Sequence, residues 1–340
     1  MRTQINSNYG LLGGSGYPFV RLRRLRKNKA IRELLQETRL SVKDFICPVF
    51  VESGLKEPKK ISSMQDVKRL PLSKITDEID SILKLGINSV ILFGIESDKD
   101  DKANAASSEK GIIQKTIKNI RSNFGEKVVI ISDVCMCQYT PKGHCGIIKN
   151  KKIDNDPTNV TLSKIAESHA AAGTDIVAPS SMMDGQVSAI RHELDEKGYF
   201  DTSILAYSAK LASPLYTPFR DLAGSYPEFG DRKTYQMPFT NPKEAIREIE
   251  MDINEGADMI MVKPAIPYLD LIYQARESFK LPLCAFSVSG EYALIKAASE
   301  QGWINEIDVM TEFLTSIKRA GADIIITYHA KKMASVLKNK

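Results

Sequence analysis

The sequence lacks the features that mark membrane-spanning and secreted proteins. No apolar run approaches the roughly 20 residues that a membrane-spanning helix needs, and the N-terminal segment has no apolar stretch of the signal-peptide kind. The 340 residues are 43% hydrophobic and 26% charged, which is the balance of a globular protein with a large buried core. We therefore expect a cytoplasmic protein with no membrane partner.

Cysteine is scarce, and its count is odd. Three of the five cysteines lie between positions 135 and 145, and the other two, Cys47 and Cys284, fall in apolar runs. Without a secretory signal, disulfides are not expected, and clustered cysteines in such a chain more often bind a metal. Cys47 and Cys284 are expected to be small buried core residues.

Acidic residues are absent from the first 32 positions, which hold eight of the 47 arginines and lysines. The remaining 39 basic residues (47 less eight) nearly balance the 42 acidic ones. A basic segment can bind nucleic acid, but Leu22 and Leu25 favour an arm that packs on protein, either its own chain or a neighbouring subunit. We expect residues 1–32 to form this arm, residues 33–340 to form one catalytic domain, and no nucleic-acid partner.

Short β-branched runs alternate with helical stretches along the rest of the chain. Several runs, such as VVIIS and MIMV, are almost entirely apolar, which is typical of strands buried on both faces of a parallel sheet. This alternation predicts an α/β protein, a closed (β/α)8 TIM barrel rather than an open sheet. The eight strands are expected over residues 45–51, 89–94, 127–133, 174–178, 203–207, 258–262, 283–288 and 323–327.

The predicted helices end in a repeated phrase. AAGTDIVAPS, NEGADMIMVKP and RAGADIIITY each combine a helix end, a glycine that stops the helix, and a buried strand. Helices are expected over residues 73–85, 162–172, 241–255 and 304–320. Two long loops, about 135–159 and 211–241, follow the third and fifth strands. In a barrel both would lie on the C-terminal face, where active sites form, and both are candidate lids.

The sharpest motif is Cys135-x-Cys137-x7-Cys145, which begins where the third predicted strand ends. Three protein ligands with one open position are typical of a catalytic zinc, whereas structural zinc sites usually have four ligands. His144 is an alternative fourth ligand, although Cys145 beside it competes for the same space. Three unrelated thiols or a redox sensor would also produce this pattern.

Two lysines follow apolar strands. Lys210 comes just after the fifth strand, and Lys263 ends the sixth. Burial and a second cation nearby both lower the pKa of a lysine, and a neutral amine can form a Schiff base with a ketone. A single lysine at a strand end is more often a salt-bridge partner, but two on adjacent strands beside a thiol cluster favour chemistry.

Candidate anion-binding groups follow these strands. Arg220 and Arg232 lie in the 211–241 loop, where they suit capture of a carboxylate, although surface ion pairs with the adjacent Asp221 and Asp231 explain them equally well. Hydroxyl groups close to the last two predicted strands are also suited to binding a carboxylate; they belong to Ser289 and Tyr328.

These residues resemble the porphobilinogen synthase (5-aminolevulinate dehydratase) family over nearly the whole chain. The segments DVCMCQYT, GHCG, YSAKLAS, YTPFRD, GDRKTYQM, MVKPA and VSGEYA occur in that family's order. The resemblance implies that two molecules of 5-aminolevulinate are joined into porphobilinogen with loss of two waters, an early step of tetrapyrrole (heme) biosynthesis.

The resemblance also implies roles at matching positions. Lys263 would form the Schiff base with the substrate in the P site, which supplies the propionate side, and Lys210 would serve the A site. The thiols of Cys135, Cys137 and Cys145 would hold zinc. The A-site substrate would be bound by Arg220, Arg232 and Gln236, and the P-site carboxylate by Ser289 and Tyr328; Asp133 and Ser180 would line the same cavity.

Two further implications concern assembly. Glu248 matches a position that binds an allosteric magnesium between subunits, and the basic arm matches one that wraps a neighbour in a homo-octamer. Some members of the family have aspartates in place of the zinc cysteines; because this chain keeps all three thiols, we expect zinc dependence. Phe286 stands where a tyrosine is frequent, and no departure removes a residue with an assigned role.

Three other functions are weighed against this one. A class I aldolase also uses a barrel lysine but needs no zinc thiolates. A binding protein that uses its basic arm on nucleic acid would leave the paired lysines and the thiol cluster unexplained. An inactive, structural barrel is disfavoured because every expected catalytic position keeps its chemical type.

Overall fold

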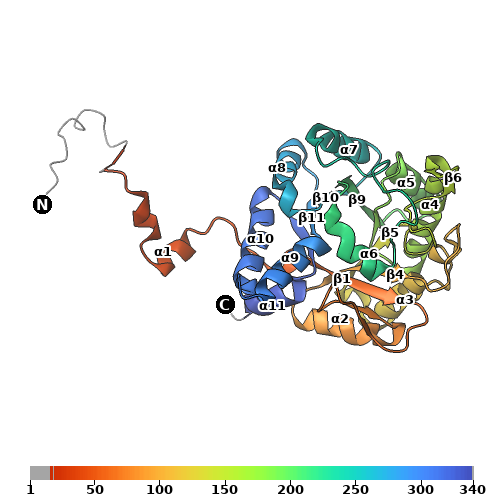
Figure 1. The fold of residues 1–340 in the computed structure, drawn as a ribbon, viewed down its shortest axis with the longest axis horizontal. Helices are drawn as coiled ribbons and strands as arrows, with labels where there is room; N and C mark the ends of the chain where they lie inside the picture. Colours follow the sequence, from red (N-terminus) through yellow and green to blue (C-terminus); the bar gives the residue numbers. More distant parts are fainter. Residues whose placement is uncertain (1–15, 18, 339–340) are drawn as a thin grey trace, which may run out of the picture. The chain divides into compact units, whose positions relative to one another are not determined.

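Eight parallel strands close into a ring surrounded by helices (Figure 1). The computed structural model describes residues 16, 17 and 19–338. The ring closes where Phe45 and Ile46 of the first strand pair with Ile325 and Ile326 of the last. The predicted (β/α)8 barrel is confirmed, and each predicted run overlaps a barrel strand. The strands are β1 (Phe45–Glu52), β4 (Ser89–Ile95), β5 (Val129–Val134), β8 (Ile176–Pro179), β9 (Ser203–Lys210), β10 (Met259–Lys263), β11 (Leu283–Ser287) and β12 (Ile324–Thr327).

Amphipathic helices cover the outside of the ring. In α2, for example, Ile75, Ile79 and Ile82 are buried at the spacing of one helix face. No helix among the described residues is long and apolar enough to cross a membrane. The helices of the barrel unit are α2 (Ile75–Lys84), α3 (Ile112–Phe124), α4 (Asn155–Ala172), α5 (Gln186–Glu196), α6 (Thr217–Ala223), α7 (Pro242–Asn254), α8 (Leu269–Ser278), α9 (Ser289–Glu300), α10 (Glu306–Ala320) and α11 (Ala330–Lys338).

Strand β9 extends three residues beyond the predicted end at residue 207 and includes Lys210. Its neighbour β10 causes this extension, because the two strands stay paired as far as Lys263 opposite Lys210, across an irregularity between Ile260 and Val262. The last residues of β9 include a serine and a lysine, which do not continue the apolar run. The strand predicted from that run therefore ended at residue 207, three residues too early.

The two predicted loops contain regular structure. The first holds a short hairpin, β6 (Ile148–Lys149) and β7 (Lys152–Ile153), and the start of α4 at Asn155 instead of residue 162. The first turns of α4 are mostly polar, so they show no amphipathic period. The second loop, 211–241, which we call the lid segment, contains η7 (Pro214–Tyr216) and α6. A second hairpin, β2 (Lys59–Lys60) and β3 (Lys68–Leu70), pairs with the end of β1.

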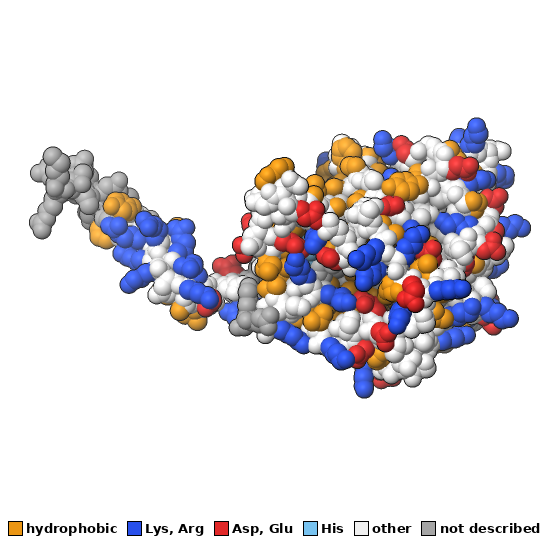
Figure 2. Space-filling model, turned by 60° about the horizontal axis from the view of Figure 1, so that its bottom comes forward, with side chains coloured by type: hydrophobic (Ala, Val, Ile, Leu, Met, Phe, Trp, Pro, Cys, Tyr) orange, Lys and Arg blue, Asp and Glu red, His pale blue; other side chains and the backbone are white. Residues whose placement is uncertain are grey.

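Residues 19–39 contain η2 (Leu22–Arg26) and α1 (Lys29–Leu34), whose side chains are exposed or partly buried. Lysine and arginine side chains crowd this arm in Figure 2. The chain divides into compact units after Arg39, whereas the predicted barrel domain begins at residue 33. Residues 1–15 and 18 of the predicted arm lie outside the described residues, and its role as a separate domain stays a prediction.

Candidate active site

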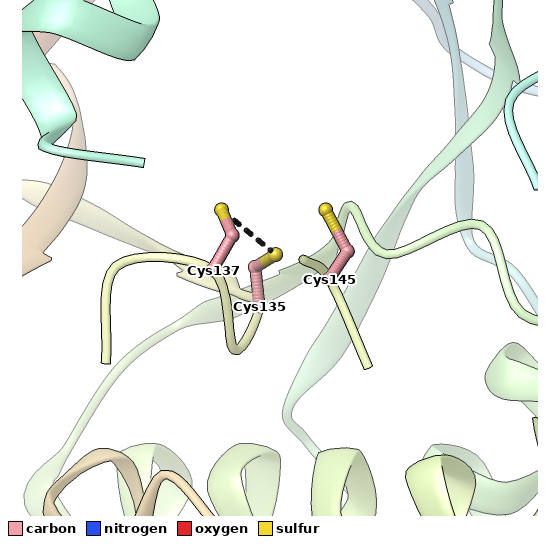
Figure 3. A group of neighbouring side chains, drawn as sticks. All are labelled: Cys135, Cys137 and Cys145. Carbon is pink, nitrogen blue, oxygen red and sulfur yellow. Dashed lines mark hydrogen bonds between the residues drawn. The ribbon is translucent and has the colours of Figure 1, made fainter. Parts of the chain in front are cut away.

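The three clustered thiols lie at the end of β5. Cys135 and Cys137 follow that strand directly, and the loop that carries Cys145 returns to meet them, so the sulfur atoms gather around one space (Figure 3). All three Sγ atoms lie within 4.8 Å of one another, and those of Cys135 and Cys137 are 3.4 Å apart. Because Zn–S bonds are about 2.3 Å, thiolates on one tetrahedral zinc lie about 3.8 Å apart. The spacing of the three sulfur atoms is therefore near that of a zinc site.

No other group of three histidine, cysteine, aspartate or glutamate side chains converges in this way among the described residues. Hydrogen bonds from Cys135 and Cys137 lower the pKa of the buried Cys145 thiol, and Arg232 lowers it further. At Cys145 these surroundings favour the thiolate form, which is the form that binds metal. Hydrogen bonding to Cys135 and Cys145 raises the pKa of Cys137, and the pKa of Cys135 is also raised.

His144, the alternative fourth ligand, is engaged elsewhere. Its Nδ1 lies 3.0 Å from the Tyr235 hydroxyl, and its Nε2 lies 2.9 Å from the Phe229 carbonyl oxygen. Both ring nitrogens therefore support the loop around the cluster. Tyr235 also packs against the three cysteines.

Lys210 and Lys263 end adjacent strands and face each other in register, and both are buried. Lys263 lies among aromatic rings: its Nζ is 3.8 Å from the ring centroid of Phe286 and 5.0 Å from that of Tyr207. Burial, and then the positive charge of Lys210, lowers the pKa of Lys263 well below its usual range. The lysine thus has the electrostatic surroundings of a neutral nucleophilic amine.

The polar groups beside the lysines come from β5 and β8. Lys210 Nζ donates to the backbone carbonyl of Ser180. The Asp133 carboxylate accepts a hydrogen bond of 3.2 Å from the Gln138 side chain. Burial, followed by the nearby Cys135, raises the pKa of Asp133 to about 6. Lys210 and Lys263 act in the opposite direction and lower the pKa of Asp133. The Asp133 carboxylate therefore interacts electrostatically with both the lysines and the thiol cluster.

The lid segment brings two arginines to the site. Arg232 is buried, and its Nη2 donates to the carbonyl oxygens of Gly143 and Ser225, each at 2.7 Å. Burial and the charge of Arg232 lower the pKa of Arg220, on α6, so the two guanidinium groups lie close enough to repel. The alternative ion pairs are not formed: Asp231 pairs with Lys233, and Asp221 accepts a hydrogen bond from Ser63.

The remaining predicted substrate-binding groups differ in their surroundings. Gln236 is buried, and its side-chain nitrogen and oxygen have no hydrogen-bond partner among the described residues. The Ser289 hydroxyl, in contrast, accepts a hydrogen bond of 2.9 Å from Phe219 N and donates one of 3.2 Å to Leu215 O. The Tyr328 ring packs on Phe286, with ring centroids 6.1 Å apart.

A small cavity of about 20 Å³ lies between these groups, roughly the space of one water. The predicted site residues that do not line it are Cys135, Cys145, Arg220, Ser289, Tyr328 and Glu248. The structure thus gathers both lysines, one clustered thiol and four of the predicted polar residues around one point, whereas the residues of the two hydroxyls are not in the lining. The cavity is lined by Phe93, Asp133, Cys137, Gln138, Ser180, Lys210, Tyr216, Phe219, Arg232, Gln236 and Lys263.

Sequence reasoning missed the aromatic residues of the site. Rings from three different parts of the barrel surround Lys263 Nζ: Tyr207 of β9, Phe219 of α6 and Phe286 of β11. Each ring lies close in the sequence to a predicted site residue: Tyr207 is three positions before Lys210, Phe219 directly precedes Arg220, and Phe286 is three positions before Ser289. Gln138, which follows Cys137 directly, was also missed.

Glu248 lies apart from the lysines and thiols, on α7. It is half-buried and lines a cavity of about 750 Å³ together with Asp184 and Glu244. Burial, and then Asp184, Glu255 and Glu244, raises the pKa of Glu248. An acidic group of this kind has the charge that suits a cation, but its oxygens do not converge within 4.8 Å as the three sulfurs do.

Together, the closed barrel and the lysines and thiols at its mouth define an enzyme of the (β/α)8-barrel class. Residues 19–336 match the family model of delta-aminolevulinic acid dehydratase. The chain belongs to this family, the hydro-lyases that form porphobilinogen, an early step of heme biosynthesis.

Relatives of known name are similar over nearly their full length. The delta-aminolevulinic acid dehydratase of Archaeoglobus fulgidus is 52% identical over 321 residues, which are 94% of this chain and 99% of the relative. The Bacillus subtilis protein of the same name is 50% identical over 94% of this chain and 98% of its own. The Toxoplasma gondii enzyme, solved in complex with its reaction product porphobilinogen, superposes with a TM-score of 0.92 at 43% identity, covering 94% of this chain and 92% of that one.

Proposed function

We propose that this enzyme joins two molecules of 5-aminolevulinate through a Schiff base on Lys263, at a site completed by zinc on Cys135, Cys137 and Cys145. One observation carries the proposal. The Lys263 amine is buried, it lies next to Lys210, and aromatic rings surround it, so that its pKa is well below the usual range.

The first covalent step follows from this environment. The neutral Lys263 amine attacks the ketone carbon of the P-site substrate and forms a carbon–nitrogen bond. The ketone oxygen then takes up two protons and leaves as the first water, and the product is a protonated imine. The faces of Phe286 and Tyr207 stabilise this cation, because aromatic rings attract positive charge.

The second substrate binds on the other side of the pair of lysines. Lys210, with Arg220, Arg232 and Gln236, receives it, and the two guanidinium groups bind its carboxylate. Gln236 supports this role, because its buried amide has two unpartnered polar atoms available for a ligand. A carbon–carbon bond to the second substrate forms at the imine carbon, from which Lys263 leaves as the free amine. A carbon–nitrogen bond forms at the ketone carbon of the second substrate, from which the second water leaves. Together the two bonds close the pyrrole ring.

The three thiols hold the metal in this proposal. Their close approach and burial support zinc, and their number leaves one position for a substrate. When bound, zinc supplies a Lewis acid that polarises an oxygen or orders an amine of the A-site substrate. Asp133 and Ser180 orient groups between this centre and the lysines.

The lid segment opens to admit substrate. A cavity of about 20 Å³ cannot hold two molecules of 5-aminolevulinate, and Tyr216, Phe219, Arg232 and Gln236 of the lid segment form much of its lining. Closure over bound substrates would exclude water and protect the imine from hydrolysis. When substrate binds, its carboxylate in the P site replaces Leu215 O as the acceptor for the Ser289 hydroxyl. Tyr328 packs on Phe286, the ring that contacts Lys263 Nζ, and its hydroxyl binds the same carboxylate.

We also propose a homo-octamer in which the basic arm wraps a neighbouring subunit, and an allosteric magnesium at Glu248. Leu22 and Leu25 of the arm are 71% and 57% exposed, which supports a partner that covers them. The acidic neighbours of Glu248 support a cation there. Light scattering of the full chain and of a variant without residues 1–32 tests the assembly. Magnesium titration of Glu248→Gln tests the metal. The cytoplasmic location stays a prediction.

The central experiment is incubation with 5-aminolevulinate and borohydride, followed by peptide mass spectrometry, with and without a zinc chelator. We expect a reduced adduct on Lys263, and porphobilinogen only when zinc is present. Lys263→Ala should give no adduct at this position, whereas the exposed control Lys197→Ala should behave as the wild type. Folded, zinc-loaded protein that forms neither adduct nor pyrrole would refute the proposal.

A further inference from the structure

The first turn of α9 is bonded to the strand end that carries Lys263. The carboxylate of Glu291 in this turn is buried, and its Oε1 accepts hydrogen bonds from the backbone N–H groups of Ala265 (2.9 Å) and Ile266 (3.1 Å). Because Pro264 has no N–H, Ala265 offers the first backbone donor after Lys263. One carboxylate oxygen therefore holds the chain immediately beyond the lysine.

The same turn is also bonded to the lid segment. The Ser289 hydroxyl bonds to the backbone of Leu215 and Phe219. At Gly290, a Cβ atom would lie only 2.6 Å from the backbone of Leu215, so a glycine is needed for the lid segment to approach this closely. Three consecutive residues of α9 thus connect the lid segment, the hydroxyl assigned to the P-site carboxylate and the end of β10.

We propose that Glu291 is a positioning residue for Lys263: by holding the N–H groups of Ala265 and Ile266, it fixes the lysine relative to the substrate carboxylate at Ser289. The proposal rests on the Schiff-base role of Lys263 given above. The nucleophile and the carboxylate-binding hydroxyl come from different strand ends, β10 and the start of α9, so their spacing needs a direct connection. Glu291 supplies that connection.

The position of the Glu291 oxygen matters in this role, and its charge does not. Burial raises the pKa of Glu291 to about 7, against hydrogen bonds from Ser287 and from the Ala265 and Ile266 N–H groups that lower it. The protonated and ionised forms are therefore both present near neutral pH, and each keeps an oxygen that accepts from the two N–H groups. Among the described residues, the phenols of Tyr216 and Tyr268 are influenced by the charge of Glu291, which adds to the burial that raises their pKa values.

Two conservative substitutions separate the position of the oxygen from its charge. Glu291→Gln removes the charge but keeps a side-chain oxygen at the same distance from the backbone. Glu291→Asp keeps the charge but withdraws the oxygens by one methylene. Glu300→Gln, on the exposed last turn of the same helix, is the matched control.

The measurement is the rate of borohydride-trapped adduct formation at Lys263, with zinc content and thermal unfolding recorded for each variant. We expect Glu291→Gln and Glu300→Gln to stay within about twofold of the wild type. Glu291→Asp should slow trapping about 10- to 100-fold, because displacing a reacting group by about 1 Å costs rates of this order. Zinc content should not change.

Several outcomes would overturn the proposal. Trapping at the wild-type rate in Glu291→Asp, even with a lower melting temperature, would make Glu291 merely structural. Slower trapping in Glu291→Gln than in Glu291→Asp would assign the effect to charge. If Glu291→Asp does not fold, a Glu291→Gln variant that folds but traps slowly would also overturn it. A wild type without any adduct at Lys263 would instead indicate that the proposed function fails.

Discussion

Lys263 of β10 lies directly opposite Lys210 of β9 in the parallel register of the barrel. Both side chains are buried, although two buried ammonium groups side by side would repel each other strongly. Proton loss from Lys263 relieves that repulsion, and burial acts in the same direction on its pKa. Burial and the neighbouring Lys210 therefore both favour the neutral form of the Lys263 amine.

Removal of the neighbouring charge should move the pH dependence of imine formation. In Lys210→Met, the pKa of Lys263 rises because a cation that lowers it has gone. A smaller fraction of the amine is then neutral at any given pH. Single-turnover borohydride trapping at Lys263, measured over a range of pH, should show its rising limb at higher pH than in the wild type. The exposed Lys197→Met variant is the control. If the pH dependence of trapping in Lys210→Met equals that of the wild type, Lys210 does not act on Lys263 through its charge.

Loss of one clustered thiol should remove zinc and activity together. Cys137→Ala leaves two thiols, which cannot replace the three-ligand centre. We expect the zinc content, measured by atomic emission, to fall. Activity should fall by more than about 10- to 100-fold, which is the typical loss when a residue that hydrogen-bonds to a metal ligand is removed. Cys47→Ala, at a buried cysteine outside the cluster, should keep zinc. Full activity in zinc-free Cys137→Ala would exclude a zinc mechanism.

The ring of Phe286 should stabilise the protonated imine. Its centroid is 3.8 Å from Lys263 Nζ, and a cation–π contact contributes about 0.5–2 kcal/mol. Phe286→Leu should therefore slow adduct formation about 2- to 30-fold, the rate equivalent of that energy. Phe286→Tyr keeps the aromatic face and should stay near the wild-type rate. Equal rates for Leu and Tyr would mean that the ring acts only through packing.

The two arginines of the lid segment should respond differently to truncation. Arg220→Ala should raise KM for 5-aminolevulinate with little change in melting temperature, because Arg220 is only partly buried and its Nε has no hydrogen-bond partner among the described residues. Arg232→Ala should also raise KM, and it should lower stability by about 1–3 kcal/mol, since the carbonyls of Gly143 and Ser225 lose their donor. Steady-state kinetics and thermal unfolding of both variants check this difference. An Arg232→Ala variant as stable as Arg220→Ala would contradict it.

Much of the fold could be read from the sequence, because buried parallel strands give apolar runs and helix ends give glycines. The pattern failed where these local signals stop. It ended the fifth strand at residue 207, because the last residues of β9 are held by pairing with β10. It began α4 at residue 162, because the first turns of that helix are polar.

The candidate site shows the same division. Cys135, Cys137 and Cys145 stand out because metal ligands cluster within a short stretch, and Lys263 stands out because a charge ends an apolar strand. The rings of Tyr207, Phe219 and Phe286 could not be predicted, since three distant segments bring them to one amine. The Glu291 bonds to Ala265 and Ile266 likewise join residues more than 20 positions apart.

The sequence by itself determined the barrel, its strands, the thiol cluster and the identity of the two lysines, because local periodicity and residue chemistry specify them. Only the tertiary structure decided that Lys210 lies opposite Lys263, that aromatic faces surround the amine, and that Arg232 bonds to the Gly143 and Ser225 carbonyls. The physical reason is that register, burial and the resulting pKa depend on contacts between segments that are far apart in the chain.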